Sequence, residues 1–332
     1  MIDSPRPRRL RALTLAWALV ALVALAGTTA LRAQSAARVG TILVAHGASE
    51  AWNRPVLELA RSVHTGGPVE VAFLMGQAAP SHRLQDAMRK LAAEGVSEIV
   101  VVPLLVSSSS EHYAQIRAMA GVPDEARQIA GRAAGGAHAQ PAARHDMAGM
   151  SGMSAEKPAD VHVPVVVTPA LDGAPEVAEV LSDRARALGK APGEQALFII
   201  AHGPNSAERY AGWMSTLRPL ADTVRAHSGF RDVRIGLVRD DAPEDVRAEA
   251  VKSVRELITL QHEITGKPVI VVPLLVSSGS VARVHFVKDL EGLPVVYGGT
   301  PLLPHPALAR WVERRVKEAT QRVESAARAH TP

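Results

Sequence analysis

The chain of 332 residues carries one pattern twice, and this repeat limits its possible folds more than any other feature. Residues 101–110 read VVPLLVSSSS and residues 271–280 read VVPLLVSSGS, with nine identities in ten positions. Each string follows an apolar run ending in Ala-His-Gly, TILVAHG with His46 in the first repeat and LFIIAHG with His202 in the second. The same strings in the same order indicate a duplicated domain.

The two repeats differ directly after the serine-rich string. The first continues with EHY from Glu111, and the second continues with VAR from Val281. His112 therefore has no histidine counterpart in the second repeat. We expect this difference to matter for function.

Both repeats alternate short β-rich runs with helical stretches. The strand candidates are continuous runs of Val, Ile and Leu, which are typical of a parallel sheet covered by helices on both faces. We predict an α/β fold of two doubly wound parallel-sheet lobes related by internal duplication, with an N-terminal segment at 1–36, a first lobe at 37–190 and a second lobe at 191–328. The expected strands are 42–45, 69–74, 99–106, 161–167, 196–201, 233–238, 269–276 and 294–297, and the expected helices are 51–63, 81–93, 111–119, 175–188, 207–226, 243–264 and 305–326.

The N-terminal segment has the order of a secretory signal. Arginines between Arg6 and Arg11 precede an apolar stretch from Ala12 to Gly27 and a run of small residues. The apolar stretch is shorter than the roughly 20 residues that a spanning helix prefers. We expect export to the periplasm or another extracytoplasmic compartment, with an uncleaved membrane anchor as the alternative. The chain has no cysteine and so no disulfide in an oxidising compartment.

The charge pattern argues against nucleic acid as a partner. The net charge is +4, but 37 basic and 33 acidic residues are interspersed, and only 3% of residues are aromatic. Nucleic-acid binding would require a clustered basic face and, for single strands, stacking rings. Affinity for an anionic small molecule remains compatible with this composition.

Candidate functional residues lie where strands are expected to end. In doubly wound sheets, ligands bind at the carboxyl ends of the strands, and His46, His202 and both serine strings fall there. Each histidine also has a non-functional interpretation. His46 would satisfy a buried hydrogen bond, His112 would be an exposed residue in the first turn of a helix, and His202 would be a remnant of the duplication without a function. The serines Ser107, Ser108, Ser109 and Ser110 can cap a helix and can also receive the carboxylates of an anionic ligand.

A low-complexity insertion at 121–158 interrupts the first repeat. It contains a set of imidazole and thioether side chains whose spacing suits capture of a soft ion such as copper. The alternative is an Ala/Gly loop that happens to contain methionines. The residues of this set are His138, His145, Met147, Met150 and Met153.

The strings TILVAHGA, VEVAFLM followed by APS, VVPLLVSSSSEH and TPLLPHPAL resemble class II chelatases of the CbiX and sirohydrochlorin chelatase type. The resemblance covers nearly all of residues 40–325 outside the insertion, as two fused CbiX-like repeats. It implies a chelatase-like fold and a lyase of tetrapyrrole or cobalamin biosynthesis. Such enzymes insert cobalt or ferrous iron, and in some cases nickel, into sirohydrochlorin or a related tetrapyrrole without an organic cofactor. The two functional histidines of the family match His46 and His112.

The chemistry of metallation suits this pair. A dehydrated divalent ion must be held over the ring while two pyrrole protons leave, and neutral imidazole serves as both ligand and base. Relatives often carry a glutamate after the second strand, where this chain has Met75 and, in the second repeat, Arg239. We expect Glu111 to substitute for it, and His202 with the four serines to contact the tetrapyrrole.

Two other functions remain open at this point. An exported metal-binding or metal-delivery protein would keep the chelatase scaffold without catalysis. A tetrapyrrole carrier would bind the ring without inserting a metal. The residues do not select among cobalt, iron, nickel, zinc and copper, because two imidazoles accept all of these ions.

Overall fold

The computed structural model of the protein describes residues 38–122 and 159–329. The predicted export signal and the predicted soft-metal set at His138, His145, Met147, Met150 and Met153 lie outside these residues and stay predictions. None of the helices within the two ranges combines the length and the hydropathy needed to cross a membrane.

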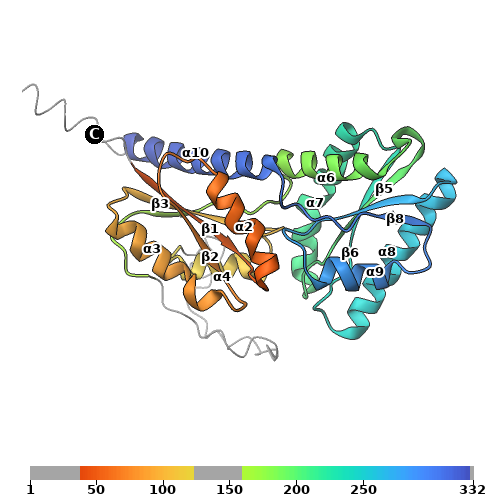
Figure 1. The fold of residues 1–332 in the computed structure, drawn as a ribbon, viewed down its shortest axis with the longest axis horizontal. Helices are drawn as coiled ribbons and strands as arrows, with labels where there is room; N and C mark the ends of the chain where they lie inside the picture. The colour runs from red at the N-terminus through yellow and green to blue at the C-terminus, as the bar shows by residue number, and fades with distance from the viewer. Residues whose placement is uncertain (1–37, 123–158, 330–332) are drawn as a thin grey trace, which may run out of the picture. The chain divides into compact units, whose positions relative to one another are not determined.

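Two four-stranded parallel sheets form the centre of the described chain (Figure 1). The strand order is β2-β1-β3-β4 in the first sheet and β6-β5-β7-β8 in the second, so the two repeats share one topology. This confirms the predicted α/β class with two parallel sheets. The first sheet consists of β1 (Val39–Ala45), β2 (Val69–Phe73), β3 (Glu98–Leu104) and β4 (Val165–Val167), and the second of β5 (Ala196–Ala201), β6 (Asp232–Leu237), β7 (Val269–Pro273) and β8 (Val295–Tyr297).

Helices cover the sheets, which explains why the central strands are mostly apolar and buried along their whole length. Every residue of β1 and β3 is buried. The first repeat contains α2 (Glu50–Ser62), α3 (Leu84–Ala93), α4 (Glu111–Met119), α6 (Pro175–Leu188) and the 3₁₀ turn η1 (Ala79–Ser81). The second contains α7 (Ala207–Ser228), α8 (Glu244–Thr265), α9 (Phe286–Asp289), α10 (Pro306–Ala329), the 3₁₀ turn η2 (Pro192–Glu194) and the π turn η3 (Val281–His285).

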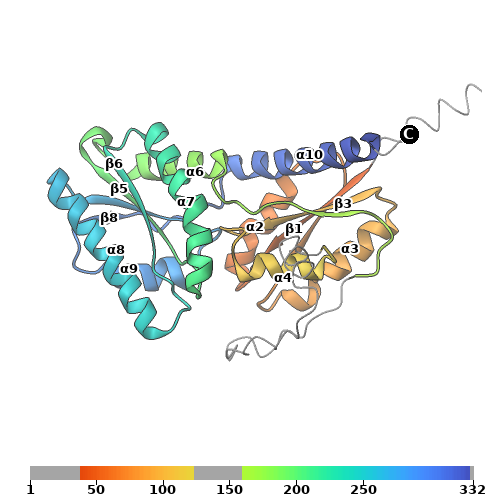
Figure 2. The same ribbon diagram turned by 180° about the vertical axis from the view of Figure 1, so that it is seen from behind.

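Helices α6 and α10 are exchanged between the repeats. Helix α6 packs against α7 and β7 of the second repeat, whereas α10 packs against β3 and α2 of the first, as Figures 1 and 2 show from opposite sides. Each sheet is therefore completed by a helix from the other half of the chain. The predicted boundary at residue 190 separates the two sequence repeats, but the packed layers cross it.

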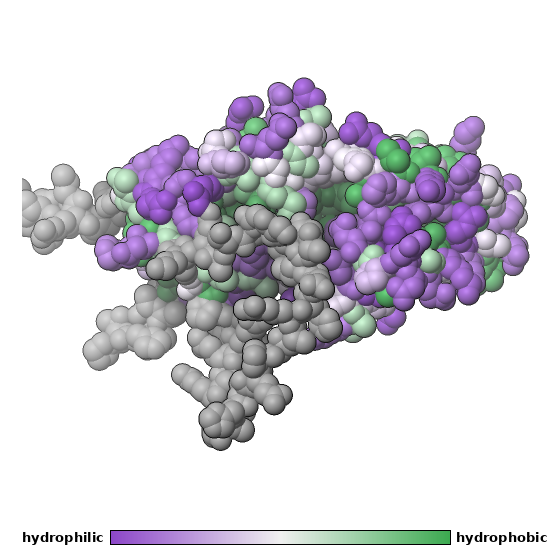
Figure 3. Space-filling view, turned by 90° about the horizontal axis from the view of Figure 1, so that it is seen from below, coloured by the Kyte–Doolittle hydropathy of each residue, from purple (hydrophilic) through white to green (hydrophobic). Residues whose placement is uncertain are grey.

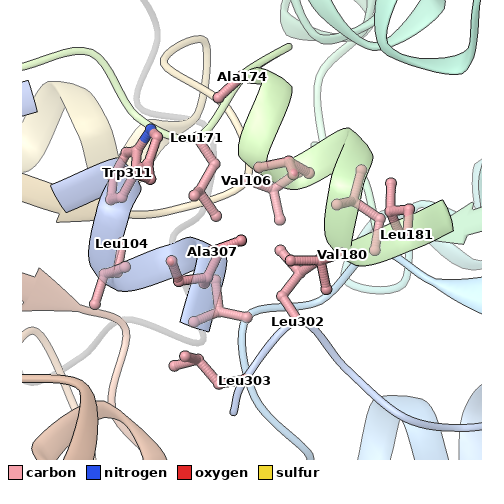
Figure 4. Close-up of a cluster of buried hydrophobic side chains, with 14 of the residues drawn as sticks. Leu104, Val106, Leu171, Ala174, Val180, Leu181, Leu302, Leu303, Ala307 and Trp311 are labelled. Carbon is pink, nitrogen blue, oxygen red and sulfur yellow. The ribbon is translucent and has the colours of Figure 1, made fainter. Parts of the chain in front are cut away.

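One apolar core follows from this exchange. Leu104 and Val106 of the first repeat lie in the same cluster as Leu302, Ala307 and Trp311 of the second (Figure 4). Trp311 is completely buried. Burial of each large apolar side chain contributes roughly 1.5–3 kcal/mol. The cluster therefore ties the two sheets together with substantial free energy.

The segment after the second serine string forms η3 and α9, where the sequence predicted no helix. In the first repeat the Ser110 hydroxyl accepts a hydrogen bond from the Tyr113 backbone N–H and caps α4. Ser280 instead has helical backbone angles and makes no such cap. Without that start signal, the helix is not apparent in the sequence.

The described surface is mainly hydrophilic in the view of Figure 3, with small hydrophobic patches. The large apolar side chains that are exposed all belong to the second repeat. They are Leu260, Ile264, Val284, Val287 and Val296.

Candidate active site

His46 directly follows β1, in a turn that requires glycine at the next position. Gly47 has a φ of 82°, and a Cβ there would lie 2.3 Å from the backbone oxygen of Met75. The Met75 N–H donates to the His46 carbonyl at 2.9 Å, so the turn is fixed to the end of β2. A side chain at position 47 would break this close approach.

The His46 ring has a defined orientation. Its Nδ1 lies 2.8 Å from the Gly47 carbonyl oxygen. A carbonyl can only accept, so Nδ1 carries the hydrogen and donates. In the neutral ring, Nε2 then keeps its lone pair for a metal ion or a proton.

His112 is the second residue of α4, behind the Ser110 cap. Its Nδ1 lies 3.3 Å from Oε1 of Gln115, one helical turn later. This contact orients the ring through the atom that faces its own helix. The opposite nitrogen, Nε2, is left for chemistry, as it is in His46.

The structure brings the two predicted histidines together. The ring centroids of His46 and His112 are 5.0 Å apart and the ring planes are inclined by 81°. A metal–imidazole bond is about 2 Å long, so nitrogens of two rings at this separation can share one ion. Their strands β1 and β3 are neighbours in the sheet, with Ala45 paired to Leu104.

Burial of its ring lowers the pKa of His46, and the nearby His112 lowers it further. The Gly47 carbonyl and Asp241 act in the opposite direction, but the net pKa stays below the usual value for histidine. The ring is therefore neutral at pH 7. That is the state in which imidazole binds a metal ion or accepts a proton.

His202 repeats the geometry of His46 in the second repeat. Its Nδ1 lies 2.9 Å from the Gly203 carbonyl, and its ring lies edge-on to Trp213 with centroids 5.2 Å apart. Burial lowers the pKa of His202, whereas Asp241, the Gly203 carbonyl and Asp240 act in the opposite direction, and the nearby His112 lowers it further. His202 is thus in electrostatic contact with the His46–His112 pair, although it belongs to the other repeat.

The second repeat contributes no counterpart of His112. Ala282 stands at that position, is completely buried, and packs in the core of the second sheet. The Tyr297 hydroxyl donates to its carbonyl at 2.8 Å. This position therefore serves the core of the second repeat.

The predicted helper Glu111 forms an ion pair across the repeats. Its Oε1 lies 2.9 Å from Nε of Arg209, a residue of α7. The same guanidinium donates from Nη1 to the Ser109 carbonyl at 3.1 Å. A metal-assisting role for Glu111 stays a prediction, since the structure shows its carboxylate engaged with Arg209.

The predicted serines are engaged in local structure. The Ser107 hydroxyl accepts from the Ser109 N–H, and the Ser108 hydroxyl donates to the Asp172 carboxylate at 2.6 Å. Ser110 caps α4 as described above. Contacts of these serines with a tetrapyrrole remain predictions, and these bonds show that the turn is firmly built.

Two acidic residues after β6 were missed by the sequence reasoning. The Asp240 N–H donates to the His202 carbonyl at 3.2 Å, in the way that Met75 bonds to His46. The sequence placed Arg239 opposite Met75, but Arg239 is an extra residue with a φ of 52°. The Asp240 side chain is buried and bonded to Arg247 and His285, whereas Asp241 is exposed. The Asp-Asp pair after the apolar run was the signal for this turn.

Within residues 38–122 and 159–329, no three His, Asp or Glu side chains are grouped as ligands of one ion. The site that the structure builds is the His46–His112 pair. From the second repeat, His202 lowers the pKa of His46 and Asp241 raises it.

The fold and the site define a two-repeat α/β protein with a pair of histidines in contact at the strand ends of its first sheet. Residues 40–188 match the family model described as CbiX. The first repeat therefore matches the CbiX family, which agrees with the resemblance to class II chelatases seen in the sequence.

Solved chelatase structures share the fold of both repeats, over most of the chain. The structure titled SirB from Bacillus subtilis with Fe3+ is 15% identical, with coverage of 87% of this chain and 98% of that chain and a TM-score of 0.57. The sirohydrochlorin chelatase SirB from Bacillus subtilis subspecies spizizenii in complex with cobalt is 13% identical, with coverage of 87% and 97% and a TM-score of 0.56.

A third solved structure extends the likeness to a larger protein. This multi-domain protein from Deinococcus radiodurans, described as structurally similar to chelatases, is 18% identical, with coverage of 84% of this chain and 54% of that chain and a TM-score of 0.50. No curated protein matches the chain. At these identities the solved structures establish the fold of the chain.

Proposed function

We propose that the protein is a metal chelatase that inserts a divalent cation, cobalt or ferrous iron, into an anionic tetrapyrrole of the sirohydrochlorin class. The observation that carries this proposal is the edge-to-face pair of His46 and His112. The match of residues 40–188 to the CbiX model and the similar structures described with iron and cobalt support it. The metal ion is a substrate, and no organic cofactor is required.

In this mechanism the two histidines perform both parts of the reaction. The Nε2 atoms of His46 and His112 hold the ion and replace part of its hydration shell. As the pyrrole nitrogens bind the ion, two pyrrole protons leave. The bond from Nε2 of His46 to the ion breaks as the ion passes to the ring, and this nitrogen then accepts one of the two pyrrole protons. Before that, the lowered pKa of His46, caused mainly by burial, keeps the ring neutral and able to bind the ion.

His202 extends the site toward the second repeat. Its Nδ1 is bound to the Gly203 carbonyl, so its Nε2 is the free nitrogen, as in His46. In our proposal it contacts the tetrapyrrole or receives the second proton. The three histidines then serve one substrate from two repeats.

The direct test is metallation of sirohydrochlorin by Co2+ or Fe2+, followed by the change in the absorption spectrum of the macrocycle. The full chain should accelerate this reaction above the rate without protein. His46→Ala and His112→Ala should each lower the rate by about 100-fold or more, which is typical of a lost acid–base group. His64→Ala, an exposed histidine after α2, is the matched control and should leave the rate unchanged.

A metal-delivery protein without catalysis is the second candidate. The engagement of Glu111 with Arg209 and the presence of Met75 after β2 favour it, since both remove a carboxylate from the pair. It is distinguished by Co2+ binding that depends on His46 and His112 while the tetrapyrrole is not metallated. The same outcome would rule out the chelatase.

Export remains part of the proposal. An N-terminal secretory signal would place the metal site outside the cytoplasm, where the ion and the tetrapyrrole would have to be supplied. Cell fractionation of the full chain tests this directly. Recovery from the cytoplasm alone would contradict it.

A further inference from the structure

The first turns of α2 and α7 occupy equivalent places in the two repeats but carry different side chains. Trp52 is the third residue of α2, and Arg209 is the third residue of α7. Each helix follows the His-Gly turn of its own repeat. Trp52 and Arg209 are therefore counterparts, and both reach the serine string of the opposite repeat.

Trp52 meets the serine string of the second repeat. The Ser277 hydroxyl donates to the Trp52 carbonyl at 2.8 Å. A Cβ on Gly279 would lie 3.4 Å from Cδ1 of the indole, which is an ordinary contact distance, so Gly279 lies directly beside Trp52.

Arg209 contacts the serine string of the first repeat, and here the smaller residue is on the helix and the larger one is in the string. Ser109 stands where the second repeat has Gly279, and the glycine is on the helix instead. A Cβ on Gly212 would lie 2.6 Å from Oγ of Ser109. Arg209 then binds the Ser109 carbonyl at 3.1 Å and the Glu111 carboxylate at 2.9 Å.

These two contacts enclose the start of α4. Ser109 and Glu111 are the residues on either side of Ser110, the cap of that helix, and His112 is the next residue. Arg209 thus holds the backbone before the cap and the side chain after it. Its guanidinium fork suits two acceptors at fixed positions better than a lysine ammonium would.

We infer that Arg209 is a positioning residue for His112: the second repeat fixes the first turn of α4, so that the His112 imidazole stays beside His46. The inference rests on the proposed function for its importance, since it assigns the second repeat a role in metal binding. It also explains why Glu111 is paired with a cation and why the second repeat has Val281 at the same place.

The test compares Co2+ binding to the full chain by titration calorimetry and by the visible spectrum of bound cobalt. Arg209→Ala should bind Co2+ about fivefold more weakly, with an altered cobalt spectrum, as expected for loss of a half-exposed pair. Glu111→Gln should have a similar effect, and this near-isosteric change is the second variant if Arg209→Ala does not fold. The charge exchange R209E/E111R should restore part of the affinity.

The matched control is Arg225→Ala on the same helix. Arg225 pairs with Asp222 at the surface of α7, away from α4. This variant should keep the affinity and the cobalt spectrum of the unchanged chain. A loss equal to that of Arg209→Ala would show that any lost charge on α7 weakens binding, and would overturn the inference.

A readout without metal separates this inference from the proposed function. In protein labelled at histidine, a nuclear Overhauser contact between the His46 and His112 rings reports their approach. Loss of this contact in Arg209→Ala supports the inference even if the unchanged chain binds no Co2+, which would itself contradict the proposed function. An unchanged ring contact in Arg209→Ala would overturn the inference.

Discussion

His46 and His112 meet edge to face with ring centroids 5.0 Å apart, and they reach this position from the ends of adjacent parallel strands. Gly47 gives the first ring its turn, and the Ser110 cap gives the second ring its helix. The pair exists because the strand order β2-β1-β3 places two chain-distant turns at one edge.

The first prediction concerns metal affinity. His46→Ala and His112→Ala should each weaken Co2+ binding by about 100-fold, since loss of a direct ligand should at least match the largest losses known for outer-shell partners. The double variant should be little weaker than either single variant, because one remaining imidazole holds the ion poorly. Titration calorimetry of all four proteins measures this. Strictly additive losses would show that the two rings bind separate ions.

The second prediction concerns stability at low pH. Burial lowers the pKa of His202 in the folded protein, whereas the unfolded chain has a value of about 6.5. Above pH 6.5 both states are neutral at this group and it has no effect. Below pH 6.5 the unfolded state takes up a proton that the folded state resists, so the free energy of unfolding falls as the pH falls toward the lowered value.

His202→Gln should therefore lose less stability between pH 7.5 and pH 5.5 than the unchanged chain, as measured by urea unfolding. His227→Gln is the control, because His227 is exposed on α7. An equal loss in the unchanged chain and in His202→Gln would show that this ring does not resist protonation.

Much of the fold could be predicted from the sequence because the duplication and the strand pattern constrain each other. The continuous Val/Ile/Leu runs predict buried parallel strands, and β5 begins and ends where expected, at Ala196 and Ala201. The exchange of α6 and α10 could not be predicted. Helical periodicity shows which face of a helix is buried, but not which sheet covers that face.

The pairing of His46 with His112 was predicted from strand-end positions and from the family resemblance, but the supporting contacts were not. Arg239 was aligned with Met75 because the count of residues after each strand suggested it. Arg239, whose φ is positive, is one extra residue in the turn after β6. Asp240 therefore takes the position that donates a hydrogen bond to the His202 carbonyl. Such a bulge changes backbone pairing without altering the apolar pattern from which the strands were predicted.

The third prediction concerns the turn that holds His46. Gly47→Ala should destabilise the protein by more than about 3 kcal/mol. The new Cβ would clash with the Met75 backbone oxygen, and alanine would also have to adopt an unfavourable positive φ. Gly66→Ala is the matched control, since Gly66 has a φ of 79° and open space around it. It should cost only about 1 kcal/mol, from the backbone conformation alone. Equal losses in urea unfolding would show that the close approach contributes nothing.

The fourth prediction concerns the contact between α7 and the first serine string. A methyl group at Gly212 would lie 2.6 Å from Oγ and 2.9 Å from Cβ of Ser109, so Gly212→Ala must push the turn before α4 away. In a helix, alanine is otherwise more favourable than glycine by about 1 kcal/mol. A loss of stability in Gly212→Ala would therefore have to come from the contact with Ser109.

Ser109→Gly removes the side chain that Gly212→Ala meets. The double variant S109G/G212A should therefore recover the stability lost in Gly212→Ala, and it should also recover Co2+ affinity if the turn before α4 sets the place of His112. Urea unfolding and Co2+ titration of the two single variants and the double variant measure both effects. If the double variant is no better than Gly212→Ala alone, the two residues do not meet and α7 does not fix this turn.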